Sequence, residues 1–285
     1  MNASNERAVP VRAHRSANIL VRAALAALCV AAFAPPLAAQ GLVRPLPPGV
    51  SPQPPPPPIQ VCFLLADTDG IELRRQPANG CDRRVSPGAT YEIAAALAGL
   101  DASVVRNSGR VSGGERLDQA LAYSSSGYFR DLDREMGSAR MGEYLSRFNY
   151  GNADTRSGGE YWNGGSLQIS PNEQMRFLQR LFDNQLPVSR QAVAGVRESL
   201  QPQGFIVASR GRVIARSGSM SGGEPPMVKT GEVDTGAESV RWQVGTLTRG
   251  SRTFIYVSCV TGPLGLAQNA AAIVADHELR NAGVQ

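Results

Sequence analysis

Two short apolar runs separated by a polar turn open the patterned part of the chain. They cover residues 60–66 and 71–75, and Asp67-Thr68-Asp69-Gly70 lies between them. A turn of this composition between two apolar runs is typical of a β-hairpin. We therefore predict two antiparallel strands at the start of the folded domain.

Helical spacing dominates the middle of the chain. Residues 90–100 are rich in alanine and leucine, residues 115–147 form a helical region interrupted at Gly127 and Gly137, and residues 189–200 continue the pattern. Between them lies a capping box with proline at the first helical position, followed by apolar residues at helical spacing: Ser170, Pro171, Glu173, then Met175, Leu178, Leu181 and Phe182. This combination predicts a helix that begins at Pro171.

Strand patterns return near the C-terminus and are followed by one last helix. The predicted strands cover 205–209, 212–216, 227–229, 240–248 and 253–260, and the helix covers 266–280. Early strands, then helices, then late strands with short connections favour an antiparallel sheet over a parallel one. The predicted fold class is α+β, an αβα sandwich whose antiparallel sheet is flanked by helices and carries an inserted helical subdomain.

The N-terminal segment has the order of a secretory signal peptide. Four arginines precede the apolar run 23–34, which ends at a proline pair and is followed by Leu37-Ala38-Ala39-Gln40. We predict that residues 1–39 are cleaved near Ala39, which places the protein in the periplasm or outside the cell. An uncleaved anchor is the alternative. The run is too short for a stable membrane span after cleavage.

A proline-rich segment, residues 40–58, follows the predicted cleavage site. It has no apolar period and should run as an extended spacer, although a partner groove could also bind it. The domain is therefore assigned to residues 59–285. Residues 1–39 hold four arginines and one glutamate, so their removal lowers the formal net charge from +5 to +2. No basic face remains to predict nucleic-acid binding.

The cysteines leave several pairings open. After cleavage the chain keeps Cys62, Cys81 and Cys259. In an oxidising compartment, three cysteines allow at most one internal disulfide. Cys62 can pair with Cys81 across a short loop or with Cys259 across two strands, and three free thiols are the further alternative.

The chain lacks the residues that several common catalytic and binding sites require. The only histidine after the leader is His277, on the last predicted helix, where a histidine more often complements the helix dipole than serves a catalytic relay. No zinc-type spacing and no phosphate-binding glycine loop occur. We therefore predict no metal and no cofactor.

Three short motifs appear in a fixed order along the chain: Tyr150-Gly151-Asn152, then Trp162 with residues 164–171, then Lys229-Thr230-Gly231. With their flanking segments, including residues 81–87 and 184–187, they resemble the class D β-lactamases and the related penicillin-binding sensor domains over nearly all of residues 60–280. The resemblance implies a β-lactamase/DD-peptidase-like fold, in which Tyr150, Gly151, Asn152, Trp162, Lys229, Thr230 and Gly231 form the ligand-binding groove.

The resemblance also shows what this chain lacks. In that family an acylated serine begins a helix, and a lysine three residues later acts as the base in its carbamate form. Here Ala89 occupies the serine position and Glu92 the lysine position, and Lys229 is the only lysine in the chain. Ser124 keeps the proton-shuttle serine, although Ser126 replaces a valine. No Ser-x-x-Lys pair exists, so the acyl-enzyme route is closed.

Glu92 retains the negative charge of the family's carbamate. It could accept hydrogen bonds from Ser124 or Lys229 and hold an inactive groove together, or it could be a drifted residue without a role. Lys229 would hold a ligand carboxylate. The family's second carboxylate-binding cation, an arginine, has no clear equivalent near Gln268. Binding of a ligand carboxylate should therefore be weaker than in that family.

Three functional hypotheses follow. The first is an inactive penicillin-binding-type protein that recognises peptidoglycan stem peptides, β-lactams or a protein partner. The second is a low-activity β-lactam hydrolase that uses Glu92 with water or with the hydroxyl of Thr90 or Ser124. The third is a protein-interaction scaffold without a small ligand.

Overall fold

A computed structural model describes residues 55–105, 114–200 and 226–284, together with the backbone of three short strand segments at 110–111, 208–209 and 212–213. The predicted signal peptide and most of the proline-rich spacer lie outside these residues, so both stay predictions. Within the described part, no helix combines the length and apolar character needed to cross a bilayer.

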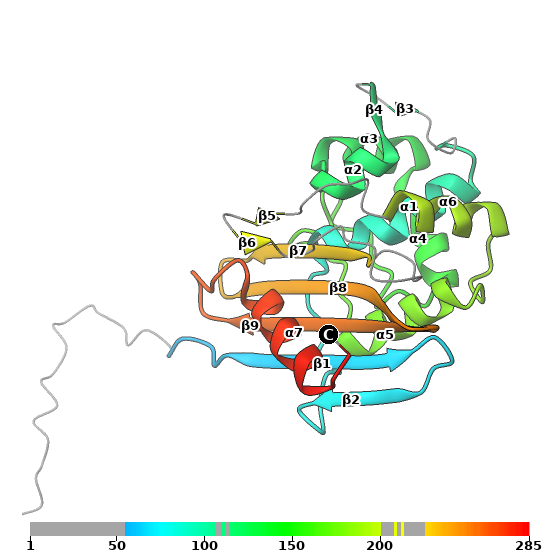
Figure 1. The fold of residues 1–285 in the computed structure, drawn as a ribbon. Coiled ribbons are helices and arrows are strands. Elements are labelled where there is room, and N and C mark those ends of the chain that lie inside the picture. The colour runs from blue at the N-terminus through cyan, green and yellow to red at the C-terminus, as the bar shows by residue number, and fades with distance from the viewer. Residues whose placement is uncertain are drawn as a thin grey trace, which may run out of the picture. The chain divides into compact units, whose positions relative to one another are not determined.

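One antiparallel sheet of five strands organises the domain (Figure 1). Its strands are β1 (Gln60–Asp67), β2 (Glu72–Gln76), β7 (Val228–Asp234), β8 (Ser239–Arg249) and β9 (Arg252–Gly262). They lie in the order β2-β1-β9-β8-β7, and every pair is antiparallel. The predicted fold class and the N-terminal hairpin are confirmed.

The two faces of the sheet bury different cores. On β1, Phe63 and Leu65 face α7 (Ala270–Asn281), while Cys62 and Leu64 belong to the larger core on the opposite face. This alternation follows from the two-residue period of a strand. The larger core also packs α5 (Pro171–Phe182) against β1 and β9, so helices cover both faces.

The helical subdomain lies beyond the β7 edge in Figure 1. Its helices are α1 (Glu92–Asp101), α2 (Leu117–Tyr123), α3 (Ser126–Met136), α4 (Ser138–Arg147) and α6 (Arg190–Leu200). The capping box predicted at Ser170 is present, because its hydroxyl accepts from the Glu173 backbone N–H and the Glu173 carboxylate accepts from the Ser170 N–H.

Three predicted boundaries need correction or completion. The break predicted at Gly127 lies instead at Ser124, whose φ of 52° ends α2, and Gly127 sits inside α3. The terminal helix begins at residue 270 rather than 266. Of the strands predicted at 205–209 and 212–216, the described parts are β5 (Ala208–Ser209) and β6 (Arg212–Val213), which pair with each other.

The cysteine pairing is resolved in favour of the short loop. Cys62 and Cys81 form a disulfide with a Cα–Cα distance of 5.6 Å, and Cys259 is free and buried.

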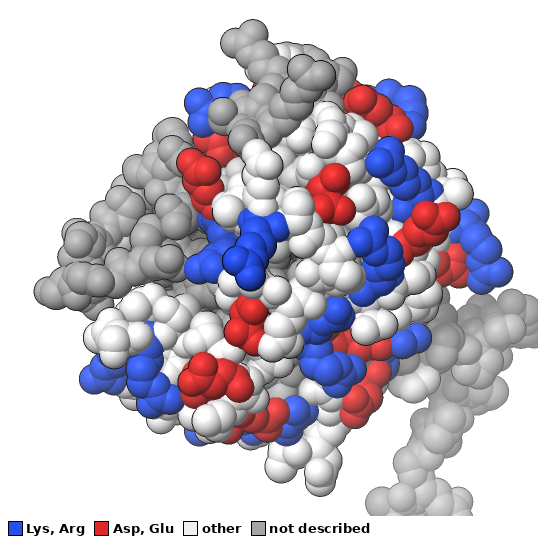
Figure 2. Space-filling model, turned by 90° about the vertical axis from the view of Figure 1, so that its right-hand side faces the viewer, with Lys and Arg blue, Asp and Glu red and all other residues white. Residues whose placement is uncertain are grey.

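Acidic and basic side chains are mixed on the surface face that Figure 2 shows. Several arginines are paired with carboxylates from distant parts of the chain, such as Arg83 with Glu238 and Arg130 with Glu160, both at 2.9 Å. Exposed pairs of this kind add little stability each.

Candidate functional site

The start of α1 packs directly against the edge strand β7. A 3-10 turn, Gly88–Tyr91, leads into the helix. A Cβ atom on Gly231 of β7 would lie 2.7 Å from the Pro87 carbonyl oxygen and 3.2 Å from the Ala89 nitrogen. Only glycine allows this approach, which sets Ala89 beside Thr230 and Gly231. The structure therefore brings the Ala89 region and the Lys-Thr-Gly segment together.

Glu92 and Lys229 form an ion pair in the interior. Glu92 lies on the first turn of α1, and its Oε2 is 2.5 Å from the Lys229 Nζ on β7. Their side chains are 2% and 3% exposed. Because a low-dielectric surrounding strengthens attraction but penalises each isolated charge, each group depends on the other to remain ionised.

The Lys229 ammonium has three partners within the protein. Besides its ion pair with the Glu92 carboxylate, Nζ donates to the Leu121 carbonyl oxygen at 2.8 Å and to Ser124 Oγ at 2.7 Å. Two of its three N–H donors are therefore used in hydrogen bonds to other groups. The role of Lys229 toward a ligand carboxylate stays a prediction, and it requires that Lys229 exchange one of these partners.

Burial shifts both ionisable groups toward their neutral forms. Desolvation raises the pKa of Glu92 to about 7, against the opposing attraction of Lys229. Desolvation likewise lowers the pKa of Lys229, with the Glu92 charge opposing that shift. At both groups, burial and the charge of the partner therefore act on the pKa in opposite directions.

Two predicted groove residues, Tyr150 and Trp162, are core aromatics. Tyr150 is 0% exposed, and Trp162 stacks on Tyr91 with ring centroids 4.8 Å apart. The Trp162 carbonyl accepts hydrogen bonds from the Ser86 hydroxyl at 2.6 Å and from the Gly88 N–H at 2.9 Å. These contacts brace the start of α1 at Ser86, Gly88 and Tyr91, the residue before Glu92.

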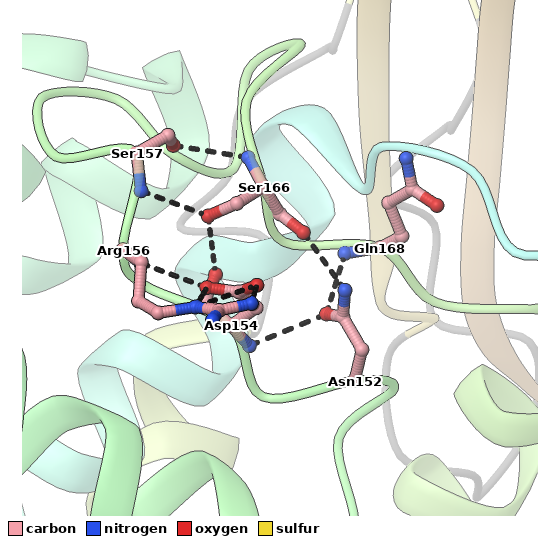
Figure 3. Close-up of polar contacts among 6 residues, drawn as sticks. All are labelled: Asn152, Asp154, Arg156, Ser157, Ser166 and Gln168. Atoms are coloured by element: carbon pink, nitrogen blue, oxygen red, sulfur yellow. Dashed lines mark hydrogen bonds and ion pairs between the residues drawn. The ribbon is translucent and has the colours of Figure 1, made fainter.

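Gly151 and Asn152 fix a loop, and Figure 3 shows the contacts that Asn152 makes in it. Gly151 has a φ of 58°, and a Cβ on it would lie 2.0 Å from the Gln168 carbonyl oxygen. The Asn152 side chain donates to the Ser166 carbonyl at 2.8 Å and accepts from the Gln168 N–H at 2.9 Å. These bonds engage both ends of the Asn152 amide, so the triplet at 150–152 supports the loop that carries Trp162. Its role in a ligand-binding groove stays a prediction.

The same loop is held by a second set of polar contacts that Figure 3 also draws. Ser166 Oγ donates to the Asp154 carbonyl at 2.9 Å, and the Arg156 guanidinium lies 2.7 Å from the Asp154 carboxylate. The loop is thereby closed on itself at its exposed side.

Sequence reasoning missed a buried arginine near the C-terminal helix. Arg241 on β8 is 3% exposed and donates to the Leu266 carbonyl at 2.9 Å. It is also ion-paired with Asp234 at 2.8 Å. A cavity beside Asp234 and Arg241 is lined by Gln268 as well. Arg241 is distant from Gln268 in the sequence. The one sequence signal for it is a charged residue within an otherwise apolar strand pattern.

Family comparison agrees with this architecture. Residues 105–277 match the model of the penicillin binding protein transpeptidase domain, and the chain belongs to this family. Among curated relatives, the regulatory protein BlaR1 of Bacillus licheniformis is 28% identical over 214 residues, which is 70% of this chain and 33% of that protein. The chain thus spans about a third of the length of BlaR1.

β-Lactamases also appear among the relatives and solved structures. Beta-lactamase OXA-5 of Pseudomonas aeruginosa is 28% identical over 211 residues, covering 68% of this chain and 73% of that enzyme. The C-terminal domain of the Bacillus licheniformis BlaR penicillin-receptor superposes with a TM-score of 0.64 at 24% identity, covering 80% of this chain and 92% of that one. The class D β-lactamase YbXI from Nostoc superposes with a TM-score of 0.64 at 21% identity, over 80% and 95% of the two chains. These superpositions show the shared fold.

Proposed function

We propose that this chain is an exported penicillin-binding-type domain that recognises peptidoglycan stem peptides or β-lactams without forming an acyl-enzyme. The observation that carries the proposal is the ion pair of Glu92 with Lys229, beside an alanine at the nucleophile position. Ala89 offers no hydroxyl to attack a carbonyl. Lys229 is the only lysine in the chain, so no second lysine exists to serve as base.

The edge strand supports the recognition part of the proposal. β7 is the last strand of the described sheet, and Thr230 and Gly231 lie where it meets the start of α1. An edge strand presents backbone N–H and C=O groups that can pair with an extended peptide. Relatives named as a penicillin receptor and as β-lactamases make a β-lactam or a peptide of similar shape the natural ligand class.

Because the Lys229 ammonium already has three partners, its expected affinity for a ligand carboxylate is low. The contact to Ser124 Oγ is only partly buried, whereas the contacts to Glu92 and to the Leu121 carbonyl are buried. A ligand would therefore displace Ser124 before the other two. Because the exchange replaces one favourable contact with another, little net free energy is gained.

Labelling with a fluorescent penicillin tests the inactive part of the proposal. The protein without residues 1–39 should give no covalent adduct after denaturing electrophoresis, and an adduct would refute the proposal. The double variant Ala89→Ser with Glu92→Lys restores a Ser-x-x-Lys pair and should be labelled if the groove still recognises β-lactams. A thermal melt shows whether the variant is folded. If it is folded and unlabelled, the groove does not recognise the β-lactam.

Binding is measured separately with a stem-peptide analogue that ends in D-Ala-D-Ala. Titration calorimetry should show weak, saturable binding to the unmodified domain. No heat and no change in melting temperature at millimolar peptide would favour the scaffold hypothesis instead.

A second candidate function rests on the pKa of Glu92. A carboxyl group with a pKa of about 7 is suited to act as a general base near neutral pH, and a hydrolase could use it to activate water. Its 2% exposure and its pairing with Lys229 argue against this role. Turnover of a chromogenic cephalosporin that disappears in Glu92→Gln would support the hydrolase.

A further inference from the structure

Three cysteines line one cavity on the α5 side of the sheet. The cavity has a volume of about 500 Å³, and its lining includes Cys62, Cys81 and Cys259. Two of these cysteines form the disulfide, and the third is a free, buried thiol. The cavity therefore holds an oxidised pair and a potential attacking group together.

Strand register places the free thiol opposite the disulfide. Cys62 on β1 is the direct partner of Cys259 on β9, and both side chains belong to the larger core. Direct partners on antiparallel strands have Cβ atoms about 4.5–5.5 Å apart, and a disulfide needs about 3.5–4.5 Å. A bridge between these residues requires a small local adjustment and no change of register.

We propose that the three cysteines form a disulfide-exchange site, in which Cys259 replaces Cys81 as the partner of Cys62. The Cys259 thiolate attacks the Cys62 sulfur, a Cys62–Cys259 bond forms, and the Cys62–Cys81 bond breaks. Cys81 leaves as a thiolate and takes up the proton that Cys259 released. The exchange conserves electrons, so it needs no external oxidant or reductant.

The surroundings of Cys259 control the rate of this step. Burial raises the pKa of its thiol, the nearby Arg83 opposes that shift, and Glu238 reinforces it. Asp82 also lines the cavity. Because only the thiolate attacks, the exchange is slow at neutral pH and accelerates as the pH rises.

The exchange would remove a covalent link from a segment that leads to the candidate site. Cys81 is partly exposed, and its carbonyl accepts from the Asn172 N–H at 3.2 Å. Asn172 also donates to the Asp82 carboxylate at 2.6 Å. Without the disulfide, these hydrogen bonds, the Arg83–Glu238 pair and the backbone bonds between Val85 and Ile169 hold this segment, which continues through Ser86 to Ala89. The new bridge closes a loop about ten times longer, which restrains the unfolded chain more strongly.

Mass spectrometry of the unmodified protein tests the proposal. The domain is incubated at about pH 9 without added thiol, then quenched in acid, denatured, alkylated and digested. The label is expected on Cys259 before incubation and on both Cys259 and Cys81 afterwards. Label confined to Cys259 throughout would overturn the proposal.

Two variants separate this exchange from general reduction and scrambling. In Cys259→Ser, Cys81 should stay unlabelled under the same treatment, and equal labelling of Cys81 would overturn the proposal. In Cys81→Ser, mild oxidation with diamide should form the Cys62–Cys259 bond. Two alkylatable cysteines in that folded, oxidised variant would show that the strands cannot be bridged. If Cys81→Ser does not fold, the labelling of the unmodified protein decides the question alone. The ligand of the β7 groove has no part in these measurements, so their result does not depend on the proposed function.

Discussion

Replacing Glu92 with glutamine removes a buried negative charge while nearly keeping the shape of the side chain. In the unmodified protein this carboxylate is 2% exposed and contacts the Lys229 ammonium. The glutamine can still accept from the ammonium through its carbonyl oxygen. The variant therefore isolates the cost of holding an ionised carboxylate inside the domain, and that cost depends on pH.

The structure gives both the sign and the size of the effect. The pKa of Glu92 rises from 4.5 in a model peptide to about 7 in the fold. Between these values the folded state binds more protons than the unfolded state, so stability is highest below about pH 4.5 and is lost as the pH rises through about 7. At 1.36 kcal/mol for each pKa unit, the loss is on the order of 3 kcal/mol.

Urea unfolding at constant ionic strength, between about pH 5 and about pH 8, measures this difference. The unmodified domain should lose on the order of 2–3 kcal/mol more than Glu92→Gln across this interval. Removing the Glu92 charge further lowers the pKa of Lys229, which changes the difference in the same direction. Glu143→Gln, at an exposed position of α4, is the matched control and should follow the unmodified protein. Parallel pH profiles for all three proteins would refute the reasoning.

Two further substitutions test the packing of the site. Lys229→Met leaves the Glu92 carboxylate buried without a counter-charge, and it should lower the free energy of unfolding by about 3–5 kcal/mol. Adding Glu92→Gln should recover part of that loss. Additive effects of the two substitutions on the free energy of unfolding would contradict the pairing. Gly151→Ala places a Cβ 2.0 Å from a backbone oxygen at a φ of 58°, whereas Gly158→Ala has a similar φ of 65° and nothing within 4 Å. Thermal melts should show a clearly larger loss for Gly151→Ala, and equal losses would mean that the loop moves aside at no cost.

The sequence predicted those parts of the fold whose signals are local. The hairpin at 60–75 and the capping box at Ser170 both depend on residues within a few positions of each other, and both are confirmed. The misplaced break at Gly127 has a physical reason. Ser124 adopts a left-handed conformation that glycine usually supplies, and its hydroxyl contacts a lysine more than a hundred residues away. No local pattern announces that contact.

The sequence predicted which residues belong to the candidate site better than it predicted how they contact each other. The motif order identified Glu92 and Lys229, and the structure places them in contact. The motif order did not indicate that the Leu121 carbonyl and Ser124 would also accept hydrogen bonds from Lys229. Nor did it indicate that Trp162 would be 3% exposed and stacked on Tyr91. Such contacts arise from tertiary packing.

The burial of Lys229 also gives the protein an unusual chemical property. As the chain has one lysine, every amine-directed reagent has only that side chain and the N-terminal amine to modify. In the folded domain this side chain is 3% exposed and occupied by three partners, so modification must wait for local opening. The rate at which such a reagent labels Lys229 is therefore a direct measure of how often the interior of the site becomes accessible. No label needs to be engineered into the protein to read it.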